Sequence, residues 1–168
     1  MEQHKTLFIL RHAKSSWNEV GKSDHERSLK ARGINDAQAM ARRHSRELAS
    51  LDLIFSSTAN RAASTAALFA QELDIPNHKL VLEDSLYAAY ESEVERIVKG
   101  LSDDLTNVMI VGHNPTFTNF ANRYFPNYIN NIPTSGLVML RFKCNSWKNI
   151  SVDNLAESIF DFPKSEED

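Results

Sequence analysis

Several side chains suited to phosphate chemistry follow short apolar runs of the chain, either at once or within the next few residues. They are Arg11, His12, Arg61 and His113. Arginine presents a planar fork of donors to phosphate oxygens, and a neutral imidazole can attack phosphorus. A fixed cation beside such a nucleophile is suited to the transfer of a phosphoryl group, whose equatorial oxygens need positive charge around them. These residue types therefore indicate a phosphate site.

Each of these side chains also has a simpler explanation when it is taken alone. An Arg11-His12 pair is more often a solvated strand end, and Arg61 is more often a surface helix residue. His113 is explained as a histidine that caps the turn between a strand and a helix. Their arrival from three strand ends favours a shared site, because ligands bind at the carboxyl ends of the strands in an α/β sheet.

The elements that must position these side chains alternate between strands and helices. Strands are predicted at 6–10, 51–55, 79–82, 107–111, 137–142 and 149–153. Helices are predicted at 33–48, at 59–73, at 91–101, and from Pro115, after Asn114 as N-cap, to about Tyr124. We expect a three-layer α/β/α sandwich with a mostly parallel central sheet, in which the last two strands form an antiparallel hairpin. The polar segments 14–28 and 83–90 are expected to be loops, the first at the active site.

The composition is that of an ordinary globular protein of 168 residues, with 42% hydrophobic and 24% charged residues. We expect one domain over residues 1–163 and a charged tail over 164–168. The net charge of −3 gives no reason to expect nucleic acid or an anionic membrane as partner. A single cysteine, Cys144, fits a reducing compartment, and no apolar run approaches a membrane span. We expect the cytoplasm.

Three other chemistries lack their motifs in this chain. A cysteine phosphatase needs arginine six residues after its nucleophile, where Cys144 has Ile150. A P-loop ending in Gly21-Lys22-Ser23 would need glycine where Ser16 stands. The histidines show no metal-ligand spacing. We expect neither a metal nor a cofactor.

The order of these motifs resembles that of the histidine phosphatase (phosphoglycerate mutase-like) superfamily. The resemblance covers nearly the whole chain and rests on Arg11-His12 after the first strand, Trp17-Asn18, Ser57 with Arg61-Ala62 and Thr65-Ala66, and Gly112-His113-Asn114. The short length, Arg11 to Trp17, Pro133 to Gly136, Trp147 and Phe162-Pro163-Lys164 resemble its compact phosphohistidine phosphatase branch, the SixA type. The chain departs from common family patterns at Ala13, Lys14 and Thr58. Of these, Lys14 adds a cation at the mouth of the site.

The resemblance implies roles for individual residues. His12 would be the nucleophile that becomes phosphohistidine, and Arg11, Arg61 and His113 would bind the phosphate. Ser15 and Asn18 would make secondary contacts. The general acid of monoesterases in this superfamily is a carboxylate, which the resemblance places at Asp84 or Glu83. Counting back from Tyr87 favours Asp84, and two solvated loop carboxylates are an equal alternative.

The resemblance also implies a substrate. We expect hydrolysis of phosphohistidine on a protein, since the compact branch lacks large lids and an open pocket admits a side chain of another protein. A small-molecule phosphomonoesterase of the same superfamily is the first alternative. A module that binds phosphohistidine without turnover is the second, although binding alone needs no nucleophile.

Overall fold

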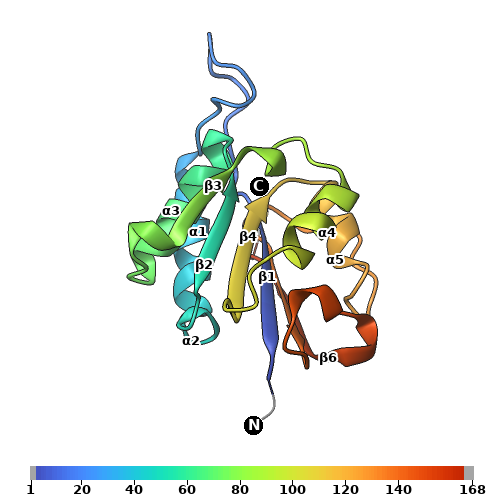
Figure 1. Cartoon of the computed structure of the whole chain (residues 1–168). Coiled ribbons are helices and arrows are strands. Elements are labelled where there is room, and N and C mark those ends of the chain that lie inside the picture. The colour runs from blue at the N-terminus through green and yellow to red at the C-terminus, as the bar shows by residue number, and fades with distance from the viewer. Residues whose placement is uncertain (1–2, 165–168) are drawn as a thin grey trace.

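The protein folds around one six-stranded sheet, seen in a computed structural model that describes residues 3–164 (Figure 1). The strand order is β3-β2-β4-β1-β5-β6. The strands are β1 Lys5–Arg11, β2 Leu53–Ser57, β3 Leu80–Glu83, β4 Asn107–Gly112, β5 Leu137–Phe142 and β6 Leu155–Asp161. The four strands from β3 to β1 are parallel, β5 is antiparallel to β1, and β6 is antiparallel to β5. The mostly parallel sheet predicted from the sequence is confirmed.

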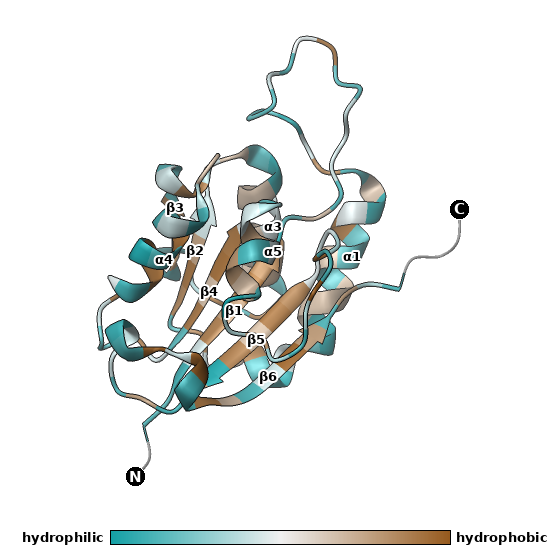
Figure 2. Ribbon diagram, turned by 90° about the vertical axis from the view of Figure 1, so that its right-hand side faces the viewer, coloured by the Kyte–Doolittle hydropathy of each residue, from teal (hydrophilic) through white to brown (hydrophobic). Residues whose placement is uncertain are grey.

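Helices cover both faces of this sheet and complete three layers (Figure 1). They are α1 Ala31–Arg43, α2 Ser45–Leu48, α3 Asn60–Glu72, α4 Glu91–Lys99 and α5 Thr116–Ala121. Phe8 and Leu10 of β1 belong to the core under α1 and α3, whereas Leu7 and Ile9 belong to the core under α4 and α5. A strand buried on both faces needs apolar residues at every position, which explains the continuous apolar run in β1 and the brown central strands of Figure 2.

Parallel pairing brings the ends of β1 and β4 to the same edge of the sheet. Arg11 is in register with Gly112, and the His12 N–H donates to the Gly112 carbonyl at 3.0 Å. A Cβ at Gly112 would lie 2.5 Å from the ring of Phe117, so glycine lets α5 pack closely under this strand end. The residues after β1, β2 and β4 therefore converge. The segment between β1 and α1 projects beyond this edge (Figure 2).

The last strand lies later in the chain than the sequence predicts. β5 does pair antiparallel with the next strand, but that strand is β6, and the prediction of a strand over 149–153 was wrong. The segment forms two short 3-10 turns, Trp147–Asn149 and Val152–Asn154. Trp147 is fully buried, and its indole N–H donates to the Leu105 carbonyl at 2.9 Å, which turns the chain inward.

Two predicted helices are shorter than expected. The helix predicted over 33–48 divides at His44 into α1 and α2, and the Nε2 atom of His44 lies 2.7 Å from Asp161 Oδ2. The helix after Asn114 ends at Ala121, and Pro115 is its N-cap residue where the sequence predicted Asn114. Asn114 Oδ1 instead accepts from the N–H and hydroxyl of Thr118, inside the first turn.

Of the predicted tail over 164–168, Lys164 alone lies within the described residues, and it is exposed. Among residues 3–164, no helix is long and apolar enough to cross a membrane.

Candidate active site

A cavity of about 490 Å³ opens where the ends of β1 and β4 meet the start of α3. The side chains that line it include those predicted from the three strand ends, namely Arg11, His12, Arg61 and His113. The rings of His12 and His113 lie 5.3 Å apart between centroids. The structure therefore brings together four side chains from three segments that are far apart in the sequence.

The ring of His12 is held with one nitrogen toward the backbone. Its Nδ1 lies 2.7 Å from the carbonyl oxygen of Ala13. Because a carbonyl can only accept, the proton is assigned to Nδ1, and Nε2 keeps its lone pair. The N–H of Ala13 donates in turn to the hydroxyl of Thr65 in α3 at 2.9 Å, so this turn is fixed to a rigid element. His12 has an oriented and unprotonated Nε2.

Burial keeps both active-site imidazoles neutral. His12 is 8% exposed, and desolvation lowers its pKa to about 3, with the nearby Arg11 and Arg61 adding to the effect. Desolvation likewise lowers the pKa of His113 to about 4. Ser57 Oγ accepts from the Ala59 N–H and lies 2.8 Å from His113 Nε2. We assign the hydroxyl proton to the hydrogen bond with Nε2, which places the ring proton of His113 on Nδ1.

Three buried nitrogens of this site have no hydrogen-bond partner within residues 3–164. They are Arg11 Nε, Arg61 Nε and His113 Nδ1. Buried donors in folded proteins are nearly always paired, and an unpaired one calls for an explanation. Three such donors, on side chains that line the same cavity as His12, are suited to an oxyanion with several oxygens, such as a phosphoryl group.

The outer edge of the Arg61 guanidinium is held by Asp24. Arg61 Nη1 donates to the Asp24 carbonyl at 2.7 Å and Nη2 to its carboxylate at 3.1 Å. Tyr87 and Arg27 also donate to this carboxylate, at 2.7 Å and 2.9 Å. The Tyr87 hydroxyl is the largest cause that lowers the Asp24 pKa, to about 2. Asp24 is therefore an ionised carboxylate.

The remaining predicted residues occupy different places. Ser15 lines the cavity, and its hydroxyl accepts from Arg27. Asn18 is exposed and does not line the cavity. The Asp84 carboxylate accepts from the Thr58 hydroxyl at 2.7 Å, and Glu83 bonds to Ser85 at the start of the next turn. Neither of these two carboxylates lines the cavity.

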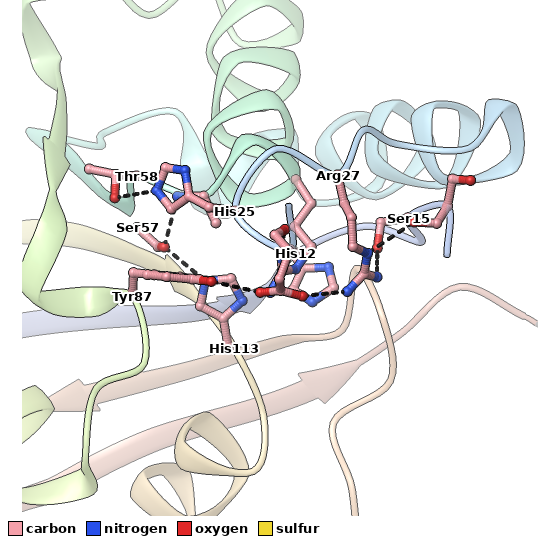
Figure 3. A network of polar contacts seen from close by, with 12 residues as sticks. His12, Ser15, His25, Arg27, Ser57, Thr58, Tyr87 and His113 are labelled. Carbon is pink, nitrogen blue, oxygen red and sulfur yellow. Dashed lines mark hydrogen bonds and ion pairs between the residues drawn. The ribbon is translucent and has the colours of Figure 1, made fainter. Parts of the chain in front are cut away.

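The projecting segment supplies residues that the motifs did not single out. Figure 3 shows Arg27 and Ser15 on one side of His12, with His113 and Tyr87 on the other. Arg27 lies 3.4 Å over the ring of Trp17, as a cation–π pair. The sequence predicted 14–28 as a polar loop at the active site, but it did not single out Asp24 or Arg27. The sequence feature that could have pointed to Asp24 and Arg27 is their opposite charge at a spacing of three residues. Such pairs are also common on solvated surfaces, so this feature does not indicate a site.

The described residues contain no group of three or more His, Cys, Asp or Glu side chains that could hold a metal ion.

Comparison with known proteins agrees with this geometry. Residues 7–86 match the model of the histidine phosphatase superfamily (branch 1). An uncharacterized protein of Mycobacterium tuberculosis is 33% identical over 112 residues, which cover 67% of each chain. A protein of Agrobacterium tumefaciens assigned as a phosphohistidine phosphatase SixA shares 28% identity, with a TM-score of 0.73 and coverage of 81% of this chain and 90% of that one. A mycobacterial glucosyl-3-phosphoglycerate phosphatase shares the fold, at 15% identity and a TM-score of 0.65, with coverage of 95% and 98%.

The sheet order and the layers define a phosphoglycerate mutase-like α/β fold, with the cavity at the carboxyl edge of its sheet. The chain belongs to the histidine phosphatase superfamily and is similar to its SixA-type members.

Because the imidazoles of His12 and His113 are neutral, their protonation is predicted to stay constant near neutral pH. Because both pKa values are lowered, the neutral rings prevail at every pH well above 4. We expect that neither ring titrates between about pH 5 and 8 in the protein free of phosphate. Ring nitrogen shifts followed by NMR will measure this, with single His→Asn variants for assignment. A midpoint near the free value for either ring would contradict the burial argument.

The carboxylate of Asp24 is predicted to oppose anion binding. It is ionised and touches Arg61, so Asp24→Asn removes a negative charge from the cavity. We expect the inhibition constant for inorganic phosphate to fall by about tenfold, which equals about 1.4 kcal/mol. Glu26→Gln is the control, since it removes a charge from the same loop outside the cavity. Weaker phosphate inhibition in Asp24→Asn would mean that orienting Arg61 outweighs the repulsion.

Proposed function

We propose that this protein hydrolyses phosphohistidine on another protein through a covalent phosphohistidine intermediate at His12. The observation that supports this substrate is that the cavity lacks a carboxylic acid able to donate a proton. Among the described residues, Asp24 is the one carboxylate that lines it, and its pKa of about 2 leaves it without a proton to donate. A substrate that needs little acid assistance suits such a site.

In the first step, His12 Nε2 attacks the phosphorus atom. The lone pair of Nε2 forms the new P–N bond. The electrons of the substrate's P–N bond return to its ring, which leaves as neutral imidazole because its other nitrogen carries a proton. The hydrogen bond from Nδ1 to the Ala13 carbonyl holds the ring and stabilises the positive charge that develops on it. Water then attacks the phosphorus atom now bound to His12. The P–N bond breaks, its electrons return to His12 Nε2, and the oxygen of water leaves in inorganic phosphate, with its protons on the phosphate or passed to solvent.

The unpaired donors bind the phosphoryl oxygens in both steps. Arg11, Arg61 and His113 offer buried N–H groups that need no reorganisation when charge spreads over the equatorial oxygens. Fixed donors of this kind are worth about 10² to 10³-fold each in rate. Arg11 is itself fixed by a 2.9 Å hydrogen bond from Nη1 to the Ile132 carbonyl.

The leaving group decides between substrate classes. An alkoxide leaves poorly without a proton, whereas an imidazole leaves readily from phosphorus. Asp84 as general acid stays a prediction for monoester substrates, and its hydrogen bond to Thr58 holds it outside the cavity. Hydrolysis of small phosphate esters is accordingly the second candidate function, favoured by the similarity in fold to a phosphatase of a small phosphoglycerate.

A substrate panel tests the proposal. We expect kcat/KM for a phosphohistidine peptide to exceed that for an aryl phosphate and for sugar phosphates by at least about 10²-fold, and chelator to leave all rates unchanged. Binding of the peptide without release of phosphate would make the protein a binding module. A preference for a small ester would move the assignment to the phosphomonoesterase, and loss of activity with chelator would contradict a metal-independent reaction.

A further inference from the structure

The cavity around His12 holds more positive charge than one phosphoryl group needs. Five cationic side chains line it, and Asp24 is the one carboxylate that lines it among residues 3–164. Arg11 and Arg61 serve the phosphoryl site, and Arg27 is bonded to Asp24 at 2.9 Å. The two that remain are Lys14 and Lys30.

The fold places Lys14 and Lys30 side by side on the cavity rim. Ser15 and Leu29 form an isolated antiparallel bridge, and the Lys30 N–H donates to the Lys14 carbonyl at 2.9 Å. The start of α1 packs directly on this pair, because a Cβ at Gly33 would lie 2.2 Å from the Lys14 carbonyl oxygen. The backbone of the rim is therefore held by a helix and by cross-chain hydrogen bonds.

Neither ammonium group has a hydrogen bond or an ion pair within the described residues. Some other lysines have an acidic partner. Lys22, on the same projecting segment, bonds to Glu19, and Lys99 lies 3.1 Å from Glu95. In a chain with a net charge of −3, two adjacent lysines without a counter-charge mark a local excess of positive potential.

The positive side chains that line the cavity can be compared with the negative charge of a phosphoryl group. A phosphoryl group has a charge of about −1.5 to −2 at neutral pH, which Arg11 and Arg61 balance. The imidazoles of His12 and His113 are neutral. Lys14 and Lys30 then remain for a second anionic group at the rim of the same cavity, whose 490 Å³ exceeds what a phosphoryl group fills.

We propose that Lys14 and Lys30 form a second anion subsite, which binds an acidic side chain next to the phosphohistidine of the protein substrate. This inference rests on the proposed function and specifies its substrate. The subsite selects a phosphohistidine flanked by Glu or Asp over one flanked by neutral residues. Because it acts through two lysine ammonium groups at the rim, this selectivity decreases as the salt concentration rises.

Two phosphohistidine peptides of equal length test this subsite, one with Glu and one with Gln at the residues beside the phosphohistidine. We expect the wild-type protein to prefer the Glu peptide by about tenfold in kcat/KM at low salt, and less at high salt. The double variant Lys14→Gln, Lys30→Gln should lose this preference. Lys22→Gln is the matched control, because it removes a lysine from the same segment outside the cavity and should keep the preference.

The outcomes separate the subsite from the proposed function. Equal rates for the two peptides in the wild type, or a preference that survives in the double variant, overturn the subsite and leave the proposed function standing. No turnover of either peptide by the wild type overturns both. Circular dichroism of each variant confirms that a lost preference does not come from unfolding.

Discussion

Replacing His12 with alanine is expected to reduce turnover by at least about 10⁴-fold, since no other nucleophile lies in the same position. The ring lines the cavity, and the hydrogen bond of its Nδ1 goes to the adjacent residue, so its loss should leave the fold intact. The measurement is kcat/KM on a phosphohistidine peptide, together with trapping of an acid-labile phosphoenzyme. The wild type should form the phosphoenzyme and His12→Ala should not.

His44→Ala provides a matched control for this experiment. His44 is also 8% exposed, but it pairs with Asp161 between α1 and β6, away from the cavity. We expect its loss to affect stability and to leave the phosphoenzyme and kcat/KM near the wild-type values. Wild-type-like activity in His12→Ala would rule out the covalent mechanism.

Replacing Arg61 with lysine is expected to reduce kcat/KM by about 10²-fold although the charge is kept. Arg61 uses Nη1 and Nη2 to hold Asp24 and presents Nε without a partner. A lysine ammonium is a single point of charge and cannot hold Asp24 and a phosphoryl oxygen in these directions at once. The rate with a saturating and a limiting substrate concentration separates an effect on kcat from one on KM.

Arg42→Lys is the control for the change in residue type. Arg42 is exposed and bonds to Glu72 at 3.3 Å, at the far end of α1. Its replacement should leave kcat/KM unchanged. If Arg61→Lys also behaves like the wild type, Arg61 does not contact the phosphoryl group.

The convergence of Arg11, His12, Arg61 and His113 could be predicted because it depends on strand ends. The apolar runs locate β1, β2 and β4, and parallel pairing then brings the residues after them to one edge. The strand over 149–153 could not be placed correctly, since Ile150 is buried and Val152 is exposed for reasons of turn geometry. The helix end at His44 likewise depends on a contact with the distant Asp161, and the end at Ala121 is followed by Asn122, whose side chain bonds to the backbone of Ile129.

The sequence by itself determined the order of the motifs, the apolar runs of the sheet and hence the family, and it predicted four side chains that the fold brings to one cavity. Only the tertiary structure decided which carboxylate enters the cavity. Asp24 reaches Arg61 across 37 residues and Tyr87 across 63, while Asp84 turns to Thr58. Local patterns specify elements, because backbone periodicity is local. A loop carboxylate such as Asp24 contacts its partners only after the fold has brought several strand and loop ends together. The spacing of residues along the chain does not show which of these ends will meet.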